Sequence, residues 1–500
     1  MASEIRVDKI NSLSGVGTVT LSPTGVDISG ITTAATLKAT TGIVTTLTAT
    51  TGIVTTLTTN TTRATTGIVT TLTATTGIVT TLTTNTLTAN STAKVGSGVT
   101  LSPDGDVFVT GVTTSSTVNV GAAVTISESG IEASGIGITC ANINGTQIGG
   151  RRNIVINGAM NVAQRGTSST SVGYQTVDRI YQAIANTDES PTITQADISS
   201  SDAPYLLGFR KSYKVQNGNQ TGGAGAADEI ATTYNVEAQD LAQSGWDYTS
   251  SSSNITLSFW VKSSVAQQFQ VNMRIYPDSG DQKEFCFEYT LSANTWTKVI
   301  KTIPGASGNV LRNTNELGMF IQFPQFYGSN YTANTRAFDT WETKNNAQNY
   351  KDYATDWYTT NDATWEITGL QLEVGSQATP FEHRSFGEEI RLCHRYYQQY
   401  PESTGDGYGL VFNAYNPYTT IAQGALTFPE MRSSPSVTTS GNFRVLERSS
   451  ARTVTGFNFY HASKTSLNPQ ATTSNLTIGE GSAVGADNDS TARIKLSSEL

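Results

Sequence analysis

Apolar and polar residues alternate along several segments in the middle of the chain. An alternation with a period of two predicts β-strands with one buried face and one polar face. Two strands are the clearest. In the first, the apolar residues Ile255, Leu257, Phe259 and Val261 alternate with Thr256, Ser258, Trp260 and Lys262 on the opposite face. In the second, Phe269, Val271, Met273 and Ile275 alternate with Gln270, Asn272, Arg274 and Tyr276. Further strands are expected around Phe285–Tyr289, Trp296–Ile303 and Trp365–Val374. Strands at this spacing without intervening helices predict a β-sandwich over residues 150–384.

A helix is expected immediately after the sandwich. Ser385-Phe-Gly-Glu388 has the spacing of a capping box, and helix-compatible residues follow it. The prediction is a linking helix over 385–400 and a C-terminal β tip domain over 401–500. The tip strands are expected at Gly409–Tyr415, Thr419–Phe428, Arg452–His461 and Ala492–Leu496.

The N-terminal part of the chain is repetitive. The unit ATTGIVTTLT occurs four times, with the insert Thr59–Arg63 between the second and third copies; the copies are Ala39–Thr48, Ala49–Thr58, Ala64–Thr73 and Ala74–Thr83. A unit with one Ile, one Val and one Leu cannot bury a core by itself, so it becomes ordered by winding around copies of itself, usually in neighbouring chains.

The spacing of the repeats bears on their geometry. Ile53 and Leu57 are odd-numbered whereas Ile68 and Leu72 are even-numbered, so a flat ribbon would change faces at the insert. A winding path avoids this conflict. A flexible threonine-rich linker is the alternative, and a coiled coil is disfavoured because Thr and Gly oppose helix formation and the apolar spacing is not heptad.

Three similar hairpins flank the threonine array. They run from Val19 to Ile31, from Val99 to Val112 and from Val124 to Ile136, and the first two contain a Ser-Pro-x-Gly turn. The expected organisation is therefore an N-terminal segment over 1–16 and a Thr/Gly-rich β stalk over 17–149. The fold class predicted for the whole chain is all-β.

Composition narrows the class of protein. Of 500 residues only 14% are charged and 37% are hydrophobic, which is typical of a turn-rich β protein and too apolar for a disordered one. The net charge of −9 argues against nucleic-acid binding. Three widely spaced cysteines, no signal-peptide pattern and no apolar run of membrane length indicate synthesis in a reducing cytoplasm.

Several motifs resemble those of a known family. A jelly-roll module found in tailed-phage fibres, similar to certain carbohydrate-binding modules, is matched by NIVINGAMNVAQRG (Asn153–Gly166), DRIY (Asp178–Tyr181) and GLQLEVGSQATPFE (Gly369–Glu382). GEEIRLCHRYY (Gly387–Tyr397) and FPEMR (Phe428–Arg432) look like segments that follow this module. SEIRVDKIN (Ser3–Asn11) and the threonine array are similar to tail-fibre proteins of marine cyanobacterial phages.

The resemblance implies a homotrimeric fibre of the virion tail. Its N-terminus would attach to a tail or baseplate protein, and its C-terminal β domains would bind host-surface polysaccharide or lipopolysaccharide. No sugar-contacting residues are carried over by the resemblance, and we found no match to catalytic motifs of fibre depolymerases. The expected partners are two further copies of the chain, a virion protein and a glycan, with no nucleic acid and no membrane insertion.

The aromatic-rich stretch from Phe323 to Tyr358 is the first candidate binding site. Sugar rings have apolar C–H faces that stack on aromatic rings, while polar side chains bond their hydroxyls, and loops on a rigid sandwich commonly hold such sites. The candidate residues here are Tyr327, Tyr331, Trp341, Tyr353 and Trp357. The alternative is that these rings pack the loop or a subunit interface.

Trp260, Arg274 and Tyr276 form the second candidate, an aromatic and polar platform on one sheet. Ordinary surface or a trimer contact is the alternative for these residues. We expect no catalytic residues, no cofactor and no enzymatic activity, because paired carboxylates and histidine dyads are not indicated by the sequence. Asp352, Asp356 and Asp362 leave a calcium site open. The alternatives for function are a polysaccharide depolymerase and a purely structural connector.

Overall fold

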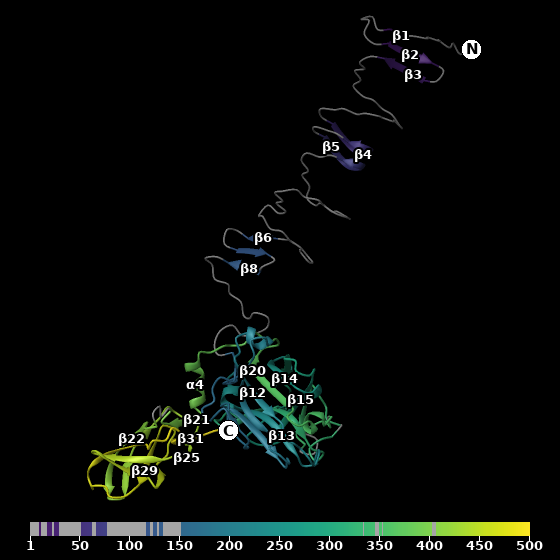
Figure 1. Cartoon of the computed structure of the whole chain (residues 1–500). Coiled ribbons are helices and arrows are strands. Elements are labelled where there is room, and N and C mark those ends of the chain that lie inside the picture. Colours follow the sequence, from purple (N-terminus) through teal and green to yellow (C-terminus); the bar gives the residue numbers. More distant parts are fainter. Residues whose placement is uncertain are drawn as a thin grey trace. The chain divides into compact units, whose positions relative to one another are not determined.

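The chain divides into two compact units, Met1–Val118 and Asn119–Leu500. The computed structural model describes residues 152–333, 335–345, 350–352, 354–402 and 407–500, and before them the backbone of eight strands. The described part is dominated by antiparallel β-sheet, with short helices between strands. The prediction of an all-β chain is confirmed in this form. Figure 1 shows the order of the elements along the chain.

The strands before residue 152 agree with two of the predicted hairpins. β2 pairs with β3 antiparallel, and β7 pairs with β8 in the same way, whereas the hairpin expected at 99–112 lies outside the described residues. The bounds are β1 Ile10–Asn11, β2 Thr18–Ser22, β3 Gly25–Ser29, β6 Thr117–Val120, β7 Val124–Ser127 and β8 Gly130–Ala133.

Two strands from the threonine array pair in parallel. β4 (Gly52–Thr62) and β5 (Gly67–Gly77) align so that Ile53 lies opposite Ile68 and Leu57 lies opposite Leu72. Equivalent apolar residues of successive repeats therefore share a row, although their numbers differ in parity. Parallel neighbours cannot be joined by a tight hairpin, so this register fits the winding path rather than a flat ribbon.

A β-sandwich of two six-stranded antiparallel sheets follows. We call them the β13 sheet and the β14 sheet. The β13 sheet has the order β10 (Ile180–Ala185), β13 (Glu229–Glu237), β18 (Leu317–Tyr327), β15 (Gln267–Ile275), β16 (Lys283–Leu291), β19 (Trp341–Thr343). The β14 sheet has the order β17 (Thr297–Pro304), β14 (Asn254–Ser263), β20 (Thr364–Val374), β12 (Lys211–Gln216), β11 (Thr192–Asp197), β9 (Ser168–Ser169).

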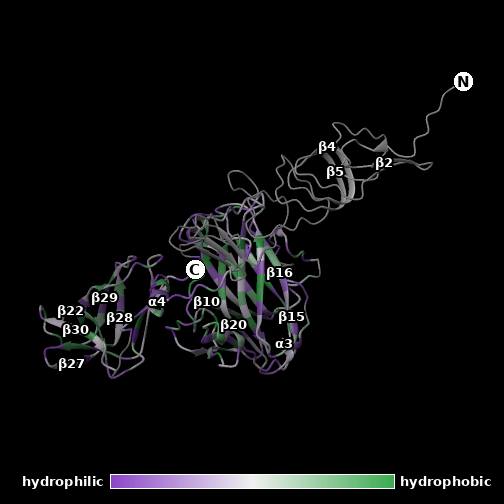
Figure 2. Ribbon diagram, turned by 90° about the horizontal axis from the view of Figure 1, so that it is seen from above, coloured by the Kyte–Doolittle hydropathy of each residue, from purple (hydrophilic) through white to green (hydrophobic). Residues whose placement is uncertain are grey.

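The predicted alternation builds the core between these sheets. The apolar rows of β14 and β15 pack in one cluster, where Leu257, Phe259, Val271 and Met273 are fully buried. Figure 2 shows hydrophobic and hydrophilic residues intermixed along the sandwich strands. Burial of this apolar surface is the main source of stability for such a fold.

Helices in the described part are short and connect strands. The linking helix begins where predicted: Glu388 donates its backbone N–H to Ser385 Oγ at 3.3 Å, and Ser385 donates its own to Glu388 Oε2 at 3.0 Å. The capping box is therefore confirmed. The bounds are α1 Ala203–Leu206, α2 Ala238–Ala242, α3 Asp356–Thr359 and α4 Phe386–His394.

The predicted extent of the linking helix, 385–400, is wrong at its C-terminal end. The helix ends at His394, and β21 (Tyr397–Tyr400) is a strand that pairs with β31. Tyr396 and Tyr397 are buried, so tertiary packing and the strand preference of tyrosine decide the conformation here.

The tip domain consists of a small sheet and a larger one. The small sheet has the order β21–β31–β25, and the larger has the order β24–β29–β23–β22–β30–β26–β27 with β28 also paired to β29. The bounds are β22 Leu410–Tyr418, β23 Ile421–Gly424, β24 Leu426–Thr427, β25 Ser436–Ser440, β26 Phe443–Glu447, β27 Ser450–Thr453, β28 Gly456–Tyr460, β29 Ser466–Thr472, β30 Gly481–Ala486 and β31 Arg493–Ser497. The β character predicted for this region is confirmed.

Polar contacts join the sandwich to the segments around the tip. Glu237 at the end of β13 is buried and accepts hydrogen bonds from Arg395 Nε at 2.8 Å and from Tyr396 Oη at 2.8 Å. Arg432 donates to the carbonyl oxygen of Asn315 at 2.7 Å. A buried acidic side chain is costly without hydrogen-bonding partners, so these contacts fix the segment after α4 to the end of β13.

Candidate functional site

An aromatic groove lies on the outer face of the β14 sheet. Its cavity volume is about 440 Å³. Strands β14, β17 and β20 form its floor, and the segments 207–209 and 378–383 form its walls. Trp260, which the sequence analysis placed on this outer face, is half-buried in the floor beside Lys298, its cross-strand neighbour on β17.

A β-bulge on β20 makes room for the aromatic side chains. The pairing of β14 with β20 shifts between Ser258 and Trp260, and Gly369 adopts φ +63° at this point. A Cβ atom at position 369 would lie 2.8 Å from the Phe209 ring and 3.3 Å from Trp260 Cδ1. Gly369 is therefore required twice, for its left-handed conformation and for the close approach of these rings.

Three aromatic rings from the two walls of the groove pack against one another. The ring centroid of Phe209 lies 4.9 Å from that of Phe381 and 5.1 Å from that of His383. His383 Nε2 is 2.9 Å from the carbonyl oxygen of Leu207, which joins the two walls. Phe209 is buried and His383 is exposed, so the cluster has an apolar base and a polar rim.

Polar side chains of β20 hold the wall that contains Phe381. Gln371 Oε1 accepts from the backbone N–H of Glu382 at 2.8 Å, and Glu373 Oε1 accepts from that of Thr379 at 2.9 Å. Both β20 side chains are buried. The wall is thus fixed by hydrogen bonds on either side of Phe381, and the groove exists before any ligand arrives.

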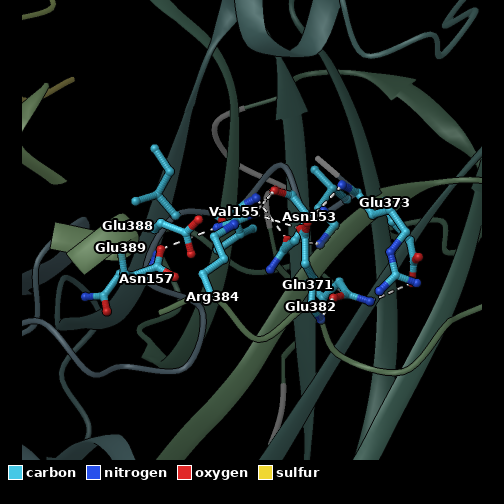
Figure 3. Close-up of polar contacts among 12 residues, drawn as sticks. Asn153, Val155, Asn157, Gln371, Glu373, Glu382, Arg384, Glu388 and Glu389 are labelled. Atoms are coloured by element: carbon cyan, nitrogen blue, oxygen red, sulfur yellow. Dashed lines mark hydrogen bonds and ion pairs between the residues drawn. The ribbon is translucent and has the colours of Figure 1, made fainter. Parts of the chain in front are cut away.

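The motifs that carried the family resemblance meet next to this wall. Glu382 Oε2 accepts from the backbone N–H of Asn153 at 2.7 Å and from Arg384 Nη2 at 2.9 Å. Arg384 also donates to the carbonyl oxygen of Val155 at 3.1 Å, and Figure 3 shows these residues as one network. Most of the motif residues in this network therefore connect β20, the first residues of the sandwich and α4, rather than contacting the groove.

The groove combines two kinds of chemistry. Trp260, Phe209 and Phe381 supply an apolar aromatic surface, while Ser258 and Lys298 supply a hydroxyl and an ammonium group at its floor. An apolar cleft with a few fixed polar groups is the usual form of a small-molecule site. Rings with C–H faces and hydroxyl edges, such as sugars, match both features.

The aromatic stretch 323–358 does not form a single binding surface. Trp357 on α3 is fully buried in the sandwich core, and Trp341 on β19 donates Nε1 to the carbonyl oxygen of Pro304 at 2.7 Å while packing against that core. Tyr353 lies outside the described residues. The structure therefore places Trp341 and Trp357 in packing roles, as the alternative interpretation held.

Tyr327 and Tyr331 lie over the outer face of the β13 sheet. Tyr327 stacks on Tyr350 with centroids 3.9 Å apart, contacts Tyr331 edge-on, and donates its hydroxyl to Glu229 at 2.5 Å. Burial, together with Tyr350 and Glu229, raises the pKa of Tyr327 well above its ordinary value. These contacts occupy the ring face and the hydroxyl of Tyr327, which leaves little of it for a sugar.

The predicted platform of Trp260, Arg274 and Tyr276 is divided between two sheets. Trp260 belongs to the β14 sheet, whereas Arg274 and Tyr276 belong to β15 and the residue after it, in the β13 sheet. Arg274 is buried and pairs with Glu284, and it lies 4.4 Å from the centroid of the Phe320 ring. The prediction of one platform is wrong, because alternation assigns residues to a face but not to a sheet.

Sequence reasoning missed most residues of the groove. Phe209 and His383 come from segments that no pattern singled out, and Lys298 lies on an expected strand but had no assigned role; the three meet through tertiary packing alone. Gly369 and Phe381 were within the motif GLQLEVGSQATPFE but had no assigned role. A glycine inside an alternating strand signals a bulge, and this signal could have pointed to the site.

The described residues also bear on metal sites and membrane spans. Within these residues, no group of three or more His, Cys, Asp or Glu side chains is placed to hold a metal ion. Asp352, Asp356 and Asp362, which the sequence left open as a calcium site, do not form such a group. In the same part of the chain, none of the helices has the length and apolar character needed to cross a membrane.

Comparisons with known proteins find solved structures that align with parts of this chain at low TM-scores. No protein-family model matches the chain, and no curated protein is detectably similar in sequence. An enzymatically active domain of tailspike protein 4 from bacteriophage CBA120 aligns over 44% of this chain and 21% of its own, at 10% identity and a TM-score of 0.24. This chain thus spans about a fifth of that tailspike.

Other similar structures include a binding module and a hydrolase. The CBM22-1 xylan-binding domain of Paenibacillus barcinonensis Xyn10C aligns over 43% of this chain and 97% of its own, at 8% identity and a TM-score of 0.21. The glycoside hydrolase domain of Endo-D from Streptococcus pneumoniae R6 aligns over 64% of this chain and 37% of its own, at 12% identity and a TM-score of 0.20. Enzymes among these structures contradict the prediction of a protein without activity, and we withdraw that prediction.

Proposed function

We propose that the chain is a tail-fibre protein of a phage that binds host-surface glycan through the groove on the β14 sheet. One observation carries the glycan-binding part: Trp260, Phe209 and Phe381 line a preformed hollow with Ser258 and Lys298 at its floor. The tail-fibre part is supported by the repeats before residue 150 and by the motifs that resemble phage fibres.

The groove suits a sugar better than a purely apolar ligand. A sugar ring stacked on Trp260 would bring its hydroxyls near Ser258 and Lys298 at the floor and His383 at the rim, which offer hydrogen-bonding groups. The ammonium group of Lys298 favours a glycan that carries a carboxylate or a phosphate, because a charge-assisted bond is about twice as strong as a neutral one.

Trimeric assembly would make weak binding sufficient. Copies held on one stalk raise the effective concentration of the remaining grooves once the first has bound. A single-site dissociation constant in the millimolar to micromolar range, about −4 to −8 kcal/mol, would then support attachment.

The test compares the full-length wild type with Trp260→Ala. Each protein is titrated with fragments of host lipopolysaccharide and capsule, and its affinity is measured. We expect affinity to fall at least about tenfold, the equivalent of about 1.4 kcal/mol of lost stacking. Trp260→Phe should restore part of it, because a smaller ring still stacks. Lys298→Ala should weaken binding of acidic fragments selectively.

The control is Val310→Ala, whose exposed side chain lies outside the groove and away from its floor strands. It should bind as the wild type does. Equal affinity for wild type and Trp260→Ala, with both proteins folded, would remove the groove from the proposal. Release of new reducing ends in the same mixtures would show that binding is accompanied by cleavage.

A further inference from the structure

The solvent face of the larger tip sheet carries a run of amide and phenol side chains. Tyr415 on β22 lies opposite Gln423 on β23, which lies opposite Gln470 on β29, which lies opposite Asn458 on β28. Residues paired across antiparallel strands point to the same face, so these four form a row. The row spans three strand spacings, about 14 Å.

A second pair lies beside this row on β28 and β29. Asn468 on β29 is opposite Tyr460 on β28. Tyr415 and Tyr460 are 52% and 46% exposed on this face, whereas Phe412 and Phe443 are buried in the core of the domain. An exposed tyrosine ring offers an apolar face for stacking and a hydroxyl for hydrogen bonding.

A shallow trough of about 420 Å³ opens along this face. Tyr415, Gln423 and Asn468 line it, and the small residues Gly424 and Ala425 lie between them. A Cβ atom at position 424 would lie 2.2 Å from the carbonyl oxygen of Asn413 and 2.6 Å from Cδ2 of the buried Phe412 ring, so glycine here lets β23 pack closely against β22. The trough thus lies over two closely packed strands.

The hydrogen-bonding groups are arranged to serve both donors and acceptors. Gln470 Nε2 donates to Gln423 Oε1 at 2.8 Å, which fixes the orientation of both amides. This bond does not use the NH₂ group of Gln423 or the carbonyl oxygen of Gln470. A hydroxyl can donate and accept at once, so adjacent hydroxyls on one ring suit such a pair.

The six side chains of the row and the second pair carry no charge, and this determines the class of ligand. They are Tyr415, Gln423, Gln470, Asn458, Asn468 and Tyr460. An anionic ligand would lose hydration on this face without gaining a cationic partner from it. Apolar ligands would leave the amides unsatisfied. A neutral, hydroxyl-rich ring system that stacks on tyrosine meets both conditions.

We propose that this face of the tip is a second glycan-binding surface, specific for neutral saccharides and distinct from the groove on the β14 sheet. It rests on the proposed glycan-binding role of the chain but not on the groove, which lies in another domain. The two surfaces differ in chemistry, since Lys298 in the groove favours acidic glycans. One chain would thus recognise two features of a host surface.

The experiment compares the full-length wild type, Tyr415→Ala, Ala425→Arg and Trp260→Ala on an array of neutral and anionic oligosaccharides. Tyr415→Ala removes the exposed ring, and Ala425→Arg fills the trough from an exposed position. We expect both to bind neutral oligosaccharides at least about tenfold more weakly, a loss of about 1.4 kcal/mol. Trp260→Ala should retain this binding.

Ile478→Ala is the matched control, because this side chain is 63% exposed in the same domain and lies outside the trough. It should bind as the wild type does. If Tyr415→Ala and Ala425→Arg both bind neutral oligosaccharides as strongly as the wild type does, the inference about the tip is overturned and the proposal for the groove is unaffected. A wild type that binds anionic oligosaccharides alone also overturns it, and a wild type that binds none overturns both proposals. A lower oligomeric mass of Ala425→Arg, with unchanged glycan binding, would assign the face to contact between copies instead.

Discussion

Single polar residues in the recognised motifs hold backbone groups that would otherwise be buried without partners. Asn157 adopts φ +61°, and its side chain donates to the carbonyl oxygens of Val162 at 2.9 Å and Asp178 at 3.0 Å. It also accepts from the backbone N–H of Val162 at 3.0 Å. Replacing such a group leaves several buried backbone atoms unsatisfied, at about 1–3 kcal/mol each.

Asp178 gives a prediction about pH. Burial raises the pKa of its carboxyl from 3.8 to about 6, although Arg165 lies 3.7 Å away and Gln164 donates two hydrogen bonds to it. A carboxyl with a raised pKa in the folded state contributes most below its unfolded pKa, and this contribution is lost as pH rises through the folded value. The window is therefore about pH 4 to 6.

We expect the stability of the wild type relative to Asp178→Asn to fall across this window, by on the order of 2 kcal/mol. Urea unfolding at pH 4 and pH 7 measures the difference. Asp197→Asn is the control, because the Asp197 side chain is 83% exposed and its pair with Lys211 is a surface pair. A relative stability that rises with pH would contradict the assignment.

At the scale of elements, the sequence predicts the end of a strand or helix correctly where that end is set by hydrogen bonds between residues close in the sequence. The capping box at Ser385 and the hairpin turn between β2 and β3 are both local, and both are found. The C-terminal end of α4 depends on β31, which is about a hundred residues away, and its predicted position was wrong.

Loss of the helix cap gives the prediction at this scale. Ser385→Ala removes the side chain that accepts from the backbone N–H of Glu388. We expect about 1 kcal/mol of destabilisation in thermal or urea unfolding. Ser385→Thr keeps the hydroxyl and should stay close to the wild type. Equal stability of Ser385→Ala and the wild type would show that the cap adds nothing to a helix held by tertiary contacts.

At the scale of the whole molecule, the outer faces of the two sandwich sheets differ. On the β13 sheet, Glu284 is fully buried between Arg274 and Arg336, and Tyr350 donates its hydroxyl to Gln322. The residues after β18 thus cover this face. The outer face of the β14 sheet keeps an open groove, and this asymmetry assigns the candidate site to that sheet.

The proposed trimer gives the prediction for the assembled chain. The threonine repeats carry too few apolar residues to bury a core in one copy, so we expect the full chain to sediment at three times 53.2 kDa. Analytical ultracentrifugation at micromolar concentration measures this mass. A chain lacking residues 1–149 is the comparison, and it should show a weaker tendency to associate. A well-ordered monomer of the full chain would refute the stalk model.

The sequence by itself determined the class of the fold, because alternation and turn residues act over a few positions. It also located the sandwich core, since residues such as Leu257 and Val271 can be buried only on the apolar face of their strands. The same periodicity correctly placed Trp260 on the opposite face.

Only the tertiary structure decided which residues form a site. Trp260, Lys298 and Phe381 meet through sheet pairing and loop packing between segments far apart in the chain, and periodicity carries no information on such contacts. Trp357, equally aromatic in the sequence, is instead buried in the core. Whether an aromatic side chain packs or binds depends on what covers it, which is a property of the folded molecule.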